Sequence, residues 1–372
     1  MKSEPLRIAF RVDADTHVGT GHLMEVMALI EAMESICAVE PLVVTRANPY
    51  TVERLERSGI RNVMLLDGGC DEEEDVIETV GILSAWGYRD LVIDLLDRSD
   101  AFYAALKERL ATTTVILDNN VHKATPADLV INFSITQSAC FYDPLPGCYL
   151  VGPRYAILGG AIAQRTPPGV KESVSRIFVN QGGGDPYGLT SKTLKAVDGM
   201  FEGAQVDVVV GGSLGRATLA ELEETKRELG GGERYIFHSN ISQQEVYDLM
   251  ERADLALTAA GNTLYELSYF GVPSIVICHH PLHDTVARAF EQEGAVINLG
   301  EGNRLDEEVI ACEALRVAGD LGLRKTLSRN MRRIVDGGGT ARVARRIAEV
   351  VRWSRQAGPA GRGKGAAEIA NF

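Results

Sequence analysis

Short apolar runs alternate with helix-length segments along almost the whole of this 372-residue chain. Runs rich in Val, Ile and Leu are typical of strands buried on both faces of a parallel sheet, and parallel neighbours need a helix-sized connection between them. In the first half, the pattern predicts strands at 7–12, 41–45, 62–66, 90–95, 113–117, 129–132 and 149–151, and helices at 22–37, 50–58, 71–86 and 99–110. This alternation indicates the α/β class.

The alternation lapses at 159–173, a stretch rich in Gly, Ala, Pro and polar residues, and then resumes. The second set has predicted strands at 176–180, 205–210, 234–238, 255–258, 274–278 and 295–298, with helices at 189–201, 216–229, 243–251, 262–270, 283–293, 305–318, 321–334 and 340–355. A chain of this length exceeds the usual single domain. We therefore expect two Rossmann-like domains with parallel sheets facing a central cleft, where open α/β sheets bind ligands at the carboxyl ends of their strands.

The expected boundaries follow from the same pattern. They are an N-terminal domain at 1–160, a linker at 161–173, a C-terminal nucleotide-binding domain at 174–340, a C-terminal helix at 341–356 and a disordered Gly-rich tail at 357–372.

Composition excludes several classes of partner. The formal net charge of -13 argues against nucleic acid, whose binding needs Lys and Arg, whereas helix ends still allow a small anionic ligand. The six cysteines contain no C-x-x-C pair, so we expect a reducing, cytoplasmic setting. No apolar run reaches about 18 residues, so no membrane span is expected. The pattern is silent on oligomeric state.

Residues 259–267 form a turn of small residues followed by a helix, between two predicted strands. Ala260 and Gly261 allow a ligand to approach the backbone closely, and the helix starting at Asn262 and Thr263 points N–H groups at it. This arrangement suits a diphosphate, and Glu266, one helical turn further on, is placed to reach a ribose hydroxyl. An ordinary tight turn between strand and helix explains the spacing equally well.

Two further loops follow predicted strands of the same domain and should line the same rim. The glycines at 182, 183 and 184 form a second turn of phosphate size, and the segment 238–241 follows another strand. Three histidines at 279, 280 and 283 raise the question of zinc. No Cys or carboxylate pattern joins them, so a loop facing the substrate, with His283 as a contact, is the preferred interpretation.

The segment 11–22 connects the first predicted strand to the first helix. Its Gly19-Thr20-Gly21 is followed by Met24 where a dinucleotide fingerprint needs a third glycine, so a nicotinamide cofactor is not expected. His22 stands at the helix start, where the helix dipole should lower its pKa and keep it neutral, as a general base requires. A surface histidine at a helix start is the alternative.

We expect the carboxylates near the ends of the predicted strands to stabilise the structure or to orient other groups. Asp13 and Asp15 spell the D-x-D of metal-dependent sugar transferases, but no other carboxylate stands at a fixed spacing to complete an octahedral site. Asp13 is therefore expected to orient a neighbour or a substrate hydroxyl, and no metal is expected. Asp94 with Asp97, and likewise Asp118, end strands and are expected to cap the following helices.

Taken in order, the motifs at 11–22, 152–158, 182–186 and 259–266 resemble the UDP-sugar hydrolase of pseudaminic acid biosynthesis, which acts on UDP-2,4-diacetamido-2,4,6-trideoxy-β-L-altropyranose. They equally resemble the related spore-coat polysaccharide proteins, and both groups are similar to the GT-B glycosyltransferase of peptidoglycan precursor synthesis. The resemblance covers about residues 6–350. It implies a GT-B fold, UDP held mainly by the C-terminal domain, and inverting hydrolysis without a metal or other cofactor.

The resemblance also implies which residues serve catalysis, substrate binding and nucleotide binding. It makes His22 the group that activates water, and places Asn262 and the Gly261 turn at the diphosphate, Glu266 at the ribose and Asn240-Ile241 beside uracil. The residues expected to serve catalysis are His22 and Asp13. The residues expected to bind the substrate are Arg11, Gly19, Thr20, Gly21, Arg154, Tyr155 and His283. The residues expected to bind the nucleotide are Gly182, Gly183, Gly184, Asn240, Ile241, Ala260, Gly261, Asn262, Thr263 and Glu266.

Two departures from the family pattern fall beside the expected sugar site. Glu25 stands where family members usually carry Arg, and the segment 282–285 replaces a usual Asp-Asn-Gln. Three hypotheses therefore stay open: a hydrolase that releases UDP from a UDP-sugar, an inverting glycosyltransferase that uses His22 to deprotonate an acceptor hydroxyl, and a nucleotide-sugar-binding protein with a degraded site.

Overall fold

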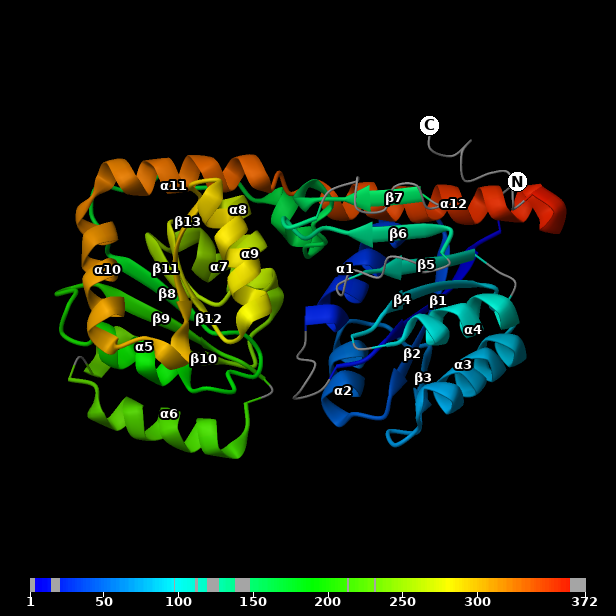
Figure 1. Ribbon diagram of the computed structural model, residues 1–372, viewed down its shortest axis with the longest axis horizontal. Helices are drawn as coiled ribbons and strands as arrows, with labels where there is room; N and C mark the ends of the chain where they lie inside the picture. The colour runs from blue at the N-terminus through cyan, green and yellow to red at the C-terminus, as the bar shows by residue number, and fades with distance from the viewer. Residues whose placement is uncertain are drawn as a thin grey trace. The chain divides into compact units, whose positions relative to one another are not determined.

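The computed structural model describes residues 4–14, 21–96, 98–110, 113–118, 127–137, 148–212, 214–230 and 232–361. The chain forms two compact units, one made of Met1–Gly160 with Gly338–Phe372 and the other of Ala161–Gly337. The C-terminal helix therefore belongs to the first unit, and the segment 161–173 belongs to the second (Figure 1).

The first unit is built on a seven-stranded sheet in which every neighbouring pair is parallel. The strand order is β3-β2-β1-β4-β5-β6-β7. The strands are β1 (Leu6–Val12), β2 (Val39–Arg46), β3 (Val63–Leu66), β4 (Asp90–Asp94), β5 (Thr113–Leu117), β6 (Leu129–Asn132) and β7 (Cys148–Val151). Its helices are α1 (Gly21–Ile36), α2 (Pro49–Arg57), α3 (Glu72–Trp86), α4 (Asp100–Leu110) and α12 (Gly339–Gly361), with the short 3-10 helix η2 (Pro153–Tyr155). A second 3-10 helix, η3 (Gly160–Gln164), begins at the last residue of the segment Met1–Gly160 and continues into the second unit.

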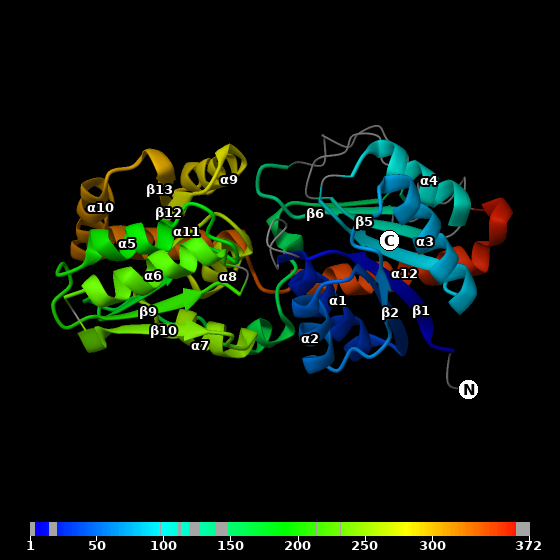
Figure 2. The same ribbon diagram turned by 90° about the horizontal axis from the view of Figure 1, so that it is seen from below.

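The two faces of this sheet are covered by different helices. Side chains alternate along each strand, so Ala9 of β1 and Ile93 of β4 point into a core shared with Val76 of α3 and Phe102 of α4. Helix α1 packs beside α12, and Figure 2 shows this pair on the side of the sheet away from α3 and α4. Arg11, two residues after Ala9, thus points toward α3, whereas Asp94, next to Ile93, points toward α1.

The second unit repeats this construction with a six-stranded parallel sheet in the order β10-β9-β8-β11-β12-β13. Its strands are β8 (Arg176–Asn180), β9 (Gln205–Val210), β10 (Tyr235–Ser239), β11 (Leu255–Thr258), β12 (Ser274–Cys278) and β13 (Val296–Glu301). Its helices are α5 (Leu189–Val197), α6 (Arg216–Glu228), α7 (Gln243–Arg252), α8 (Asn262–Phe270), α9 (Pro281–Gln292), α10 (Glu307–Gly319) and α11 (Leu321–Ile334), with 3-10 helices η4 (Gly232–Arg234) and η5 (Gly302–Arg304).

Helices again cover both faces of the second sheet, with α5 packed against α10 and α8 against α11. Helix α5 ends four residues earlier than the sequence predicts, because the chain leaves the helix at Asp198 and turns at Gly199, whose φ is +72°. Helix α12 continues to Gly361, past the end expected at 356. No helix within the described ranges is both long and apolar enough to cross a bilayer.

Candidate functional site

The first unit has its topological switch point between β1 and β4. From β1 the chain proceeds through β2 and β3 on one side, and from β4 it proceeds through β5, β6 and β7 on the other. Helices that follow the two central strands lie on opposite faces, so a crevice is expected at their carboxyl ends, where open α/β sheets bind ligands. The polar side chains at these two strand ends are therefore the candidate site.

A histidine–aspartate pair lies at this edge. His22 is the second residue of α1, and its Nδ1 lies 2.5 Å from Oδ1 of Asp94, the last residue of β4. The Asp94 side chain is fully buried, and that of His22 is 11% exposed. The expectation that Asp94 caps the next helix is wrong: at the start of α4 the N–H of Phe102 donates to Ser99 Oγ instead.

The protonation state of His22 also differs from the neutral state expected from its position at the helix start. Burial by itself lowers the pKa of an imidazole, and the helix dipole acts in the same direction. The charge of Asp94, its hydrogen bond to the ring and the charge of Glu25 outweigh burial and raise the pKa of His22 to about 9. His22 is therefore an imidazolium at pH 7, because a buried carboxylate from another element dominates the local helix field.

Glu25 completes a set of three converging side chains. It lies one turn after His22 on the same face of α1, is buried, and offers an oxygen within 4.8 Å of the ligand atoms of His22 and Asp94. One imidazole and two carboxylates are donors that a divalent transition metal accepts. The H-x-x-E spacing on α1 was a readable signal, but Asp94 arrives from a distant strand, so the sequence interpretation missed the set.

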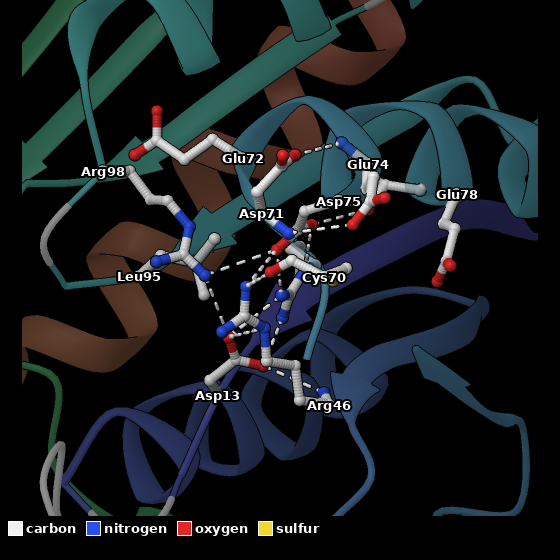
Figure 3. Close-up of polar contacts among 12 residues, drawn as sticks. Asp13, Arg46, Cys70, Asp71, Glu72, Glu74, Asp75, Glu78, Leu95 and Arg98 are labelled. Carbon is white, nitrogen blue, oxygen red and sulfur yellow. Dashed lines mark hydrogen bonds and ion pairs between the residues drawn. The ribbon is translucent and has the colours of Figure 1, made fainter. Parts of the chain in front are cut away.

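Asp13, expected to orient a neighbour or a substrate hydroxyl, and Arg11, expected to bind the substrate, belong to one ion-pair network, in which Figure 3 labels Asp13 and Asp75. Arg11 is fully buried, and its guanidinium binds Asp75 of α3 and Asp13 through both oxygens of each carboxylate. Asp13 also accepts a hydrogen bond from the backbone N–H of Arg46. Arg11 thus holds the strand end and cannot touch a ligand directly. Gly19 and Thr20 lie outside the described residues, as do Asp15 and Asp97, and Gly21 begins α1.

Arg154 and Tyr155 stand apart from this edge. They lie in η2, directly after β7, the outermost strand of the sheet and three strands from β4. Neighbouring strands are roughly 4.8 Å apart. The Arg154 guanidinium lies over the Tyr155 ring. The backbone carbonyl of Arg154 accepts a hydrogen bond from the side chain of Arg342 in α12. Within the first unit, the structure therefore does not bring these two residues to the His22–Asp94 pair.

In the second unit, the triple-glycine turn follows β8, and Asn180 connects it to the neighbouring strand ends. Oδ1 of Asn180 accepts from the N–H of Gly182 and from Thr263 Oγ1, while its Nδ2 donates to the carbonyl of Val209. Gly182 has a φ of +81°, a left-handed conformation that favours glycine. The turns at 182–184 and 261–263 thus meet at the ends of the adjacent strands β8 and β11.

These two turns present backbone rather than side chains. Gly261 is the N-cap of α8 and has no side chain with which to cap the helix. The carbonyls of Gly182 and Gly183 lie so close to Gly211, after β9, that a Cβ there would be 2.4 and 2.3 Å from their oxygens. The chain after β8 therefore packs directly against the chain after β9, and the N-terminus of α8, which has no side-chain cap, is the part of this edge that suits an anion.

Glu266 is held by two residues of α7. Its Oε1 accepts hydrogen bonds from Gln243 Nε2 at 2.6 Å and from the Tyr247 hydroxyl at 3.1 Å. Burial raises the pKa of the Glu266 carboxyl to about 7, although these two hydrogen bonds act in the other direction. Asn240, with a φ of +55°, and Ile241 lie just before α7, so the Gln243 contact brings that loop toward Glu266. The sequence interpretation missed both α7 partners.

His283 lies in the first turn of α9, beside two other histidines. Burial, together with the neighbouring His280 and His279, lowers its pKa to about 3, so the ring is neutral at pH 7. Nε2 of His279 donates to the carbonyl of Gln181 at 2.7 Å, which joins this loop to the glycine turn after β8. A neutral His283 can offer hydrogen bonds to a substrate but no positive charge.

Two known proteins are similar to this chain in sequence. The spore coat polysaccharide biosynthesis protein SpsG of Bacillus subtilis is 30% identical over 257 residues, which are 68% of this chain and 74% of that protein. The uncharacterized protein MJ1062 of Methanocaldococcus jannaschii is 22% identical over 286 residues, which are 74% of this chain and 56% of that protein. The chain thus matches little more than half of the archaeal relative. Comparison with models of protein families finds no match.

Solved structures show the fold. The Staphylococcus aureus MnaA–UDP co-structure matches with a TM-score of 0.66 and 12% identity, covering 94% of this chain and 98% of that one. MurG of Acinetobacter baumannii matches with a TM-score of 0.62 and 13% identity, covering 93% and 100%. Each unit has a parallel sheet with surrounding helices, as in these GT-B proteins, and this confirms the expected α/β fold class.

Proposed function

Since the chain belongs to the family of the spore coat polysaccharide biosynthesis protein SpsG, we propose that it hydrolyses a UDP-linked sugar for surface-polysaccharide or nonulosonic acid biosynthesis. The observation that carries this proposal is the 2.5 Å contact between His22 and Asp94 at the β1/β4 crevice. A histidine oriented by a buried carboxylate is the arrangement with which enzymes move a proton to or from water. The substrate suggested by the family resemblance is a UDP-linked diacetamido-trideoxy-hexose.

The proposed reaction is a single displacement at the anomeric carbon. Neutral His22 takes a proton from water while the water oxygen bonds to the anomeric carbon, and Asp94 stabilises the resulting imidazolium. The bond from that carbon to the diphosphate oxygen breaks with inversion, and UDP leaves with the electron pair. His22 then returns its proton to solvent. The chemistry requires no metal, and a positioned base contributes typically about 10²–10⁴-fold.

The second unit is proposed to hold the UDP. The glycine turn at 182–184 and the N-terminus of α8 supply backbone N–H groups for the diphosphate, whose negative charge increases as the bond breaks. Glu266, which accepts hydrogen bonds from Gln243 and Tyr247, is proposed to accept hydrogen bonds from ribose hydroxyls as well. Asn240 and Ile241, brought close by the same contacts, are proposed to lie beside the base.

Isotope labelling tests the proposal. Purified protein is incubated with UDP-linked amino sugars in ¹⁸O-water, and the products are analysed by mass spectrometry and NMR. We expect the label on the anomeric carbon of a sugar released with inverted configuration. Label in UDP would contradict the mechanism. His22→Asn should abolish most turnover while UDP binding persists, and Glu34→Gln, an exposed change on the same helix, should leave both unchanged.

Transfer to an acceptor is the second candidate function. The same pair can deprotonate a sugar hydroxyl as readily as water, and the SpsG family takes its name from polysaccharide synthesis. UDP release that depends on an added acceptor sugar, with no label incorporated from ¹⁸O-water, would identify a glycosyltransferase.

A further inference from the structure

Three arginines surround two aspartates at the carboxyl edge of the first sheet. We name Arg11, Asp13, Arg46, Asp75 and Arg98 the arginine cluster; Figure 3 labels Asp13, Arg46, Asp75 and Arg98. Arg11 lies in β1, Arg46 ends β2 and Arg98 follows β4, so the cluster spans the three strands at the switch point. It lies on the α3 side of the sheet, across the edge from the His22–Asp94 pair.

Arg11 lies at the centre of this cluster, and all of its side-chain hydrogen-bond donors have partners. Its Nε donates to Asp75 at 3.1 Å, its Nη1 to Asp13 at 2.5 Å and to the Val12 carbonyl at 3.2 Å, and its Nη2 to Asp13 at 2.9 Å and to Asp75 at 2.7 Å. These contacts use all five N–H donors of a guanidinium. Although burial opposes it, Arg11, with Arg98 and Arg46, lowers the pKa of Asp75.

The other two arginines bring the cluster to three positive and two negative charges. Acidic side chains at the start of α3 bind elsewhere: Asp71 and Glu74 form the capping box of that helix, and Glu72 accepts from the N–H and hydroxyl of Ser99. Within the described residues, the ion pairs of Arg98 are those with Asp13 and Asp75. One positive charge in excess, in a largely buried cluster, is unfavourable unless an anion joins it.

Arg98 has hydrogen-bond donors that the cluster does not use, and among the described residues the buried Nε of Arg46 also has no hydrogen-bond partner. Only Nη2 of Arg98 reaches the cluster, at 3.4 Å from Asp13 and 3.3 Å from Asp75, and the buried Nε of Arg98 has no hydrogen-bond partner among the described residues. The side chains of Arg98 and Arg46 are 12% and 29% exposed, so both are accessible at the surface of the cluster. A guanidinium with free donors matches the planar or tetrahedral oxygens of a carboxylate or phosphate.

The cluster lies close to the proposed catalytic pair. Arg98 is four residues after Asp94, and both charges act on the Tyr103 hydroxyl of α4. We propose that Arg98 and Arg46 form an oxyanion site in the first unit, and that the molecule entering the β1/β4 crevice carries a carboxylate, phosphate or sulfate besides any diphosphate held by the second unit. All residues of this site belong to the first unit, and their binding of an oxyanion does not depend on whether the reaction is hydrolysis or transfer.

Calorimetric titration of the full-length protein with inorganic phosphate, sulfate and acetate tests the site, at constant ionic strength set with chloride and with saturating UDP present. We expect saturable binding of at least one oxyanion, weakened tenfold or more in Arg98→Gln and in Arg46→Gln. Arg109→Gln, an exposed change on α4, is the matched control and should bind like the wild type. No saturable binding, or equal binding in Arg98→Gln and the wild type, would overturn the proposal.

Two further arms separate a folding defect from a binding defect and identify the source of the anion. Thermal melting and UDP affinity are measured for each variant. Arg46→Gln, at the more exposed position, keeps the test valid if Arg98→Gln does not fold. A UDP-uronate is then compared with the neutral UDP-hexose. A KM for the uronate alone that rises in Arg98→Gln assigns the anion to the sugar, and unchanged KM values with lost phosphate binding assign it to a separate acceptor or effector.

Discussion

Asp94→Asn is the substitution that most directly tests how the first unit works. It keeps the shape and hydrogen-bonding length of the side chain but removes the charge that raises the pKa of His22 to about 9. Without that charge, burial lowers the pKa of the imidazole, and Glu25 opposes burial only in part. We therefore expect the pKa of His22 in the variant to fall close to or below 6.5.

The magnitude follows from the size of the shift. A rise from 6.5 to about 9 corresponds to about 3 kcal/mol of preference for the imidazolium in the folded protein. Because the folded pKa lies above the unfolded one, this stabilisation is complete below about pH 6.5 and is lost as the pH rises through 9. Asp94→Asn should therefore lower the free energy of unfolding by about 3 kcal/mol at pH 6 and by much less at pH 10.

The same shift governs catalysis, because a base must be neutral. In the wild type about 1% of His22 is neutral at pH 7, so kcat/KM should rise tenfold per pH unit and level off near pH 9. In Asp94→Asn the plateau should begin near pH 6.5 and lie lower, because an amide does not stabilise the imidazolium.

The assay is UDP release followed from pH 5.5 to 10, with urea unfolding at pH 6 and 10. Glu34→Gln serves as the control on the same helix. A wild-type profile that levels off at or below pH 6.5, or an identical profile in Asp94→Asn, would refute the reasoning.

Three further predictions concern other parts of the molecule. Exhaustive treatment with a chelator should leave turnover unchanged, and activity that is lost and then restored by a divalent cation would instead make His22, Glu25 and Asp94 a metal site. Glu266→Gln should weaken UDP binding about tenfold above pH 7, where the carboxylate is ionised, and less at pH 5.5; equal loss at both pH values in calorimetry would contradict a charged ribose contact. Gly211→Ala should destabilise the second unit by about 1–3 kcal/mol and weaken UDP binding, since its Cβ would meet the carbonyl of Gly183. Gly215→Ala, where nothing lies within 4 Å, is its control in urea unfolding, and equal stability of the two variants would show that the turn adapts.

Most strands and helices could be predicted from local sequence patterns. The strand at 90–95 and the helix at 22–37 are predicted almost to the residue, because apolar periodicity and turn residues act over a few positions and the sheets impose no unusual conformation. The turn at 259–263 was found for the same reason. Local reasoning was wrong where two distant segments meet: the start of α1 suggested a neutral His22, and the end of β4 suggested a helix cap at Asp94.

The sequence by itself determined the order and type of the elements, the two α/β units and the loops that carry polar residues, since each depends on short-range periodicity. Tertiary structure decided which loops are neighbours and what charge their side chains bear. Strand order places β4 beside β1, and the alternation of side chains along β4 turns Asp94 toward His22 and away from Arg11. A pKa or an ion pair depends on distances of a few ångströms between residues about 70 positions apart, and those distances arise only when the sheet assembles.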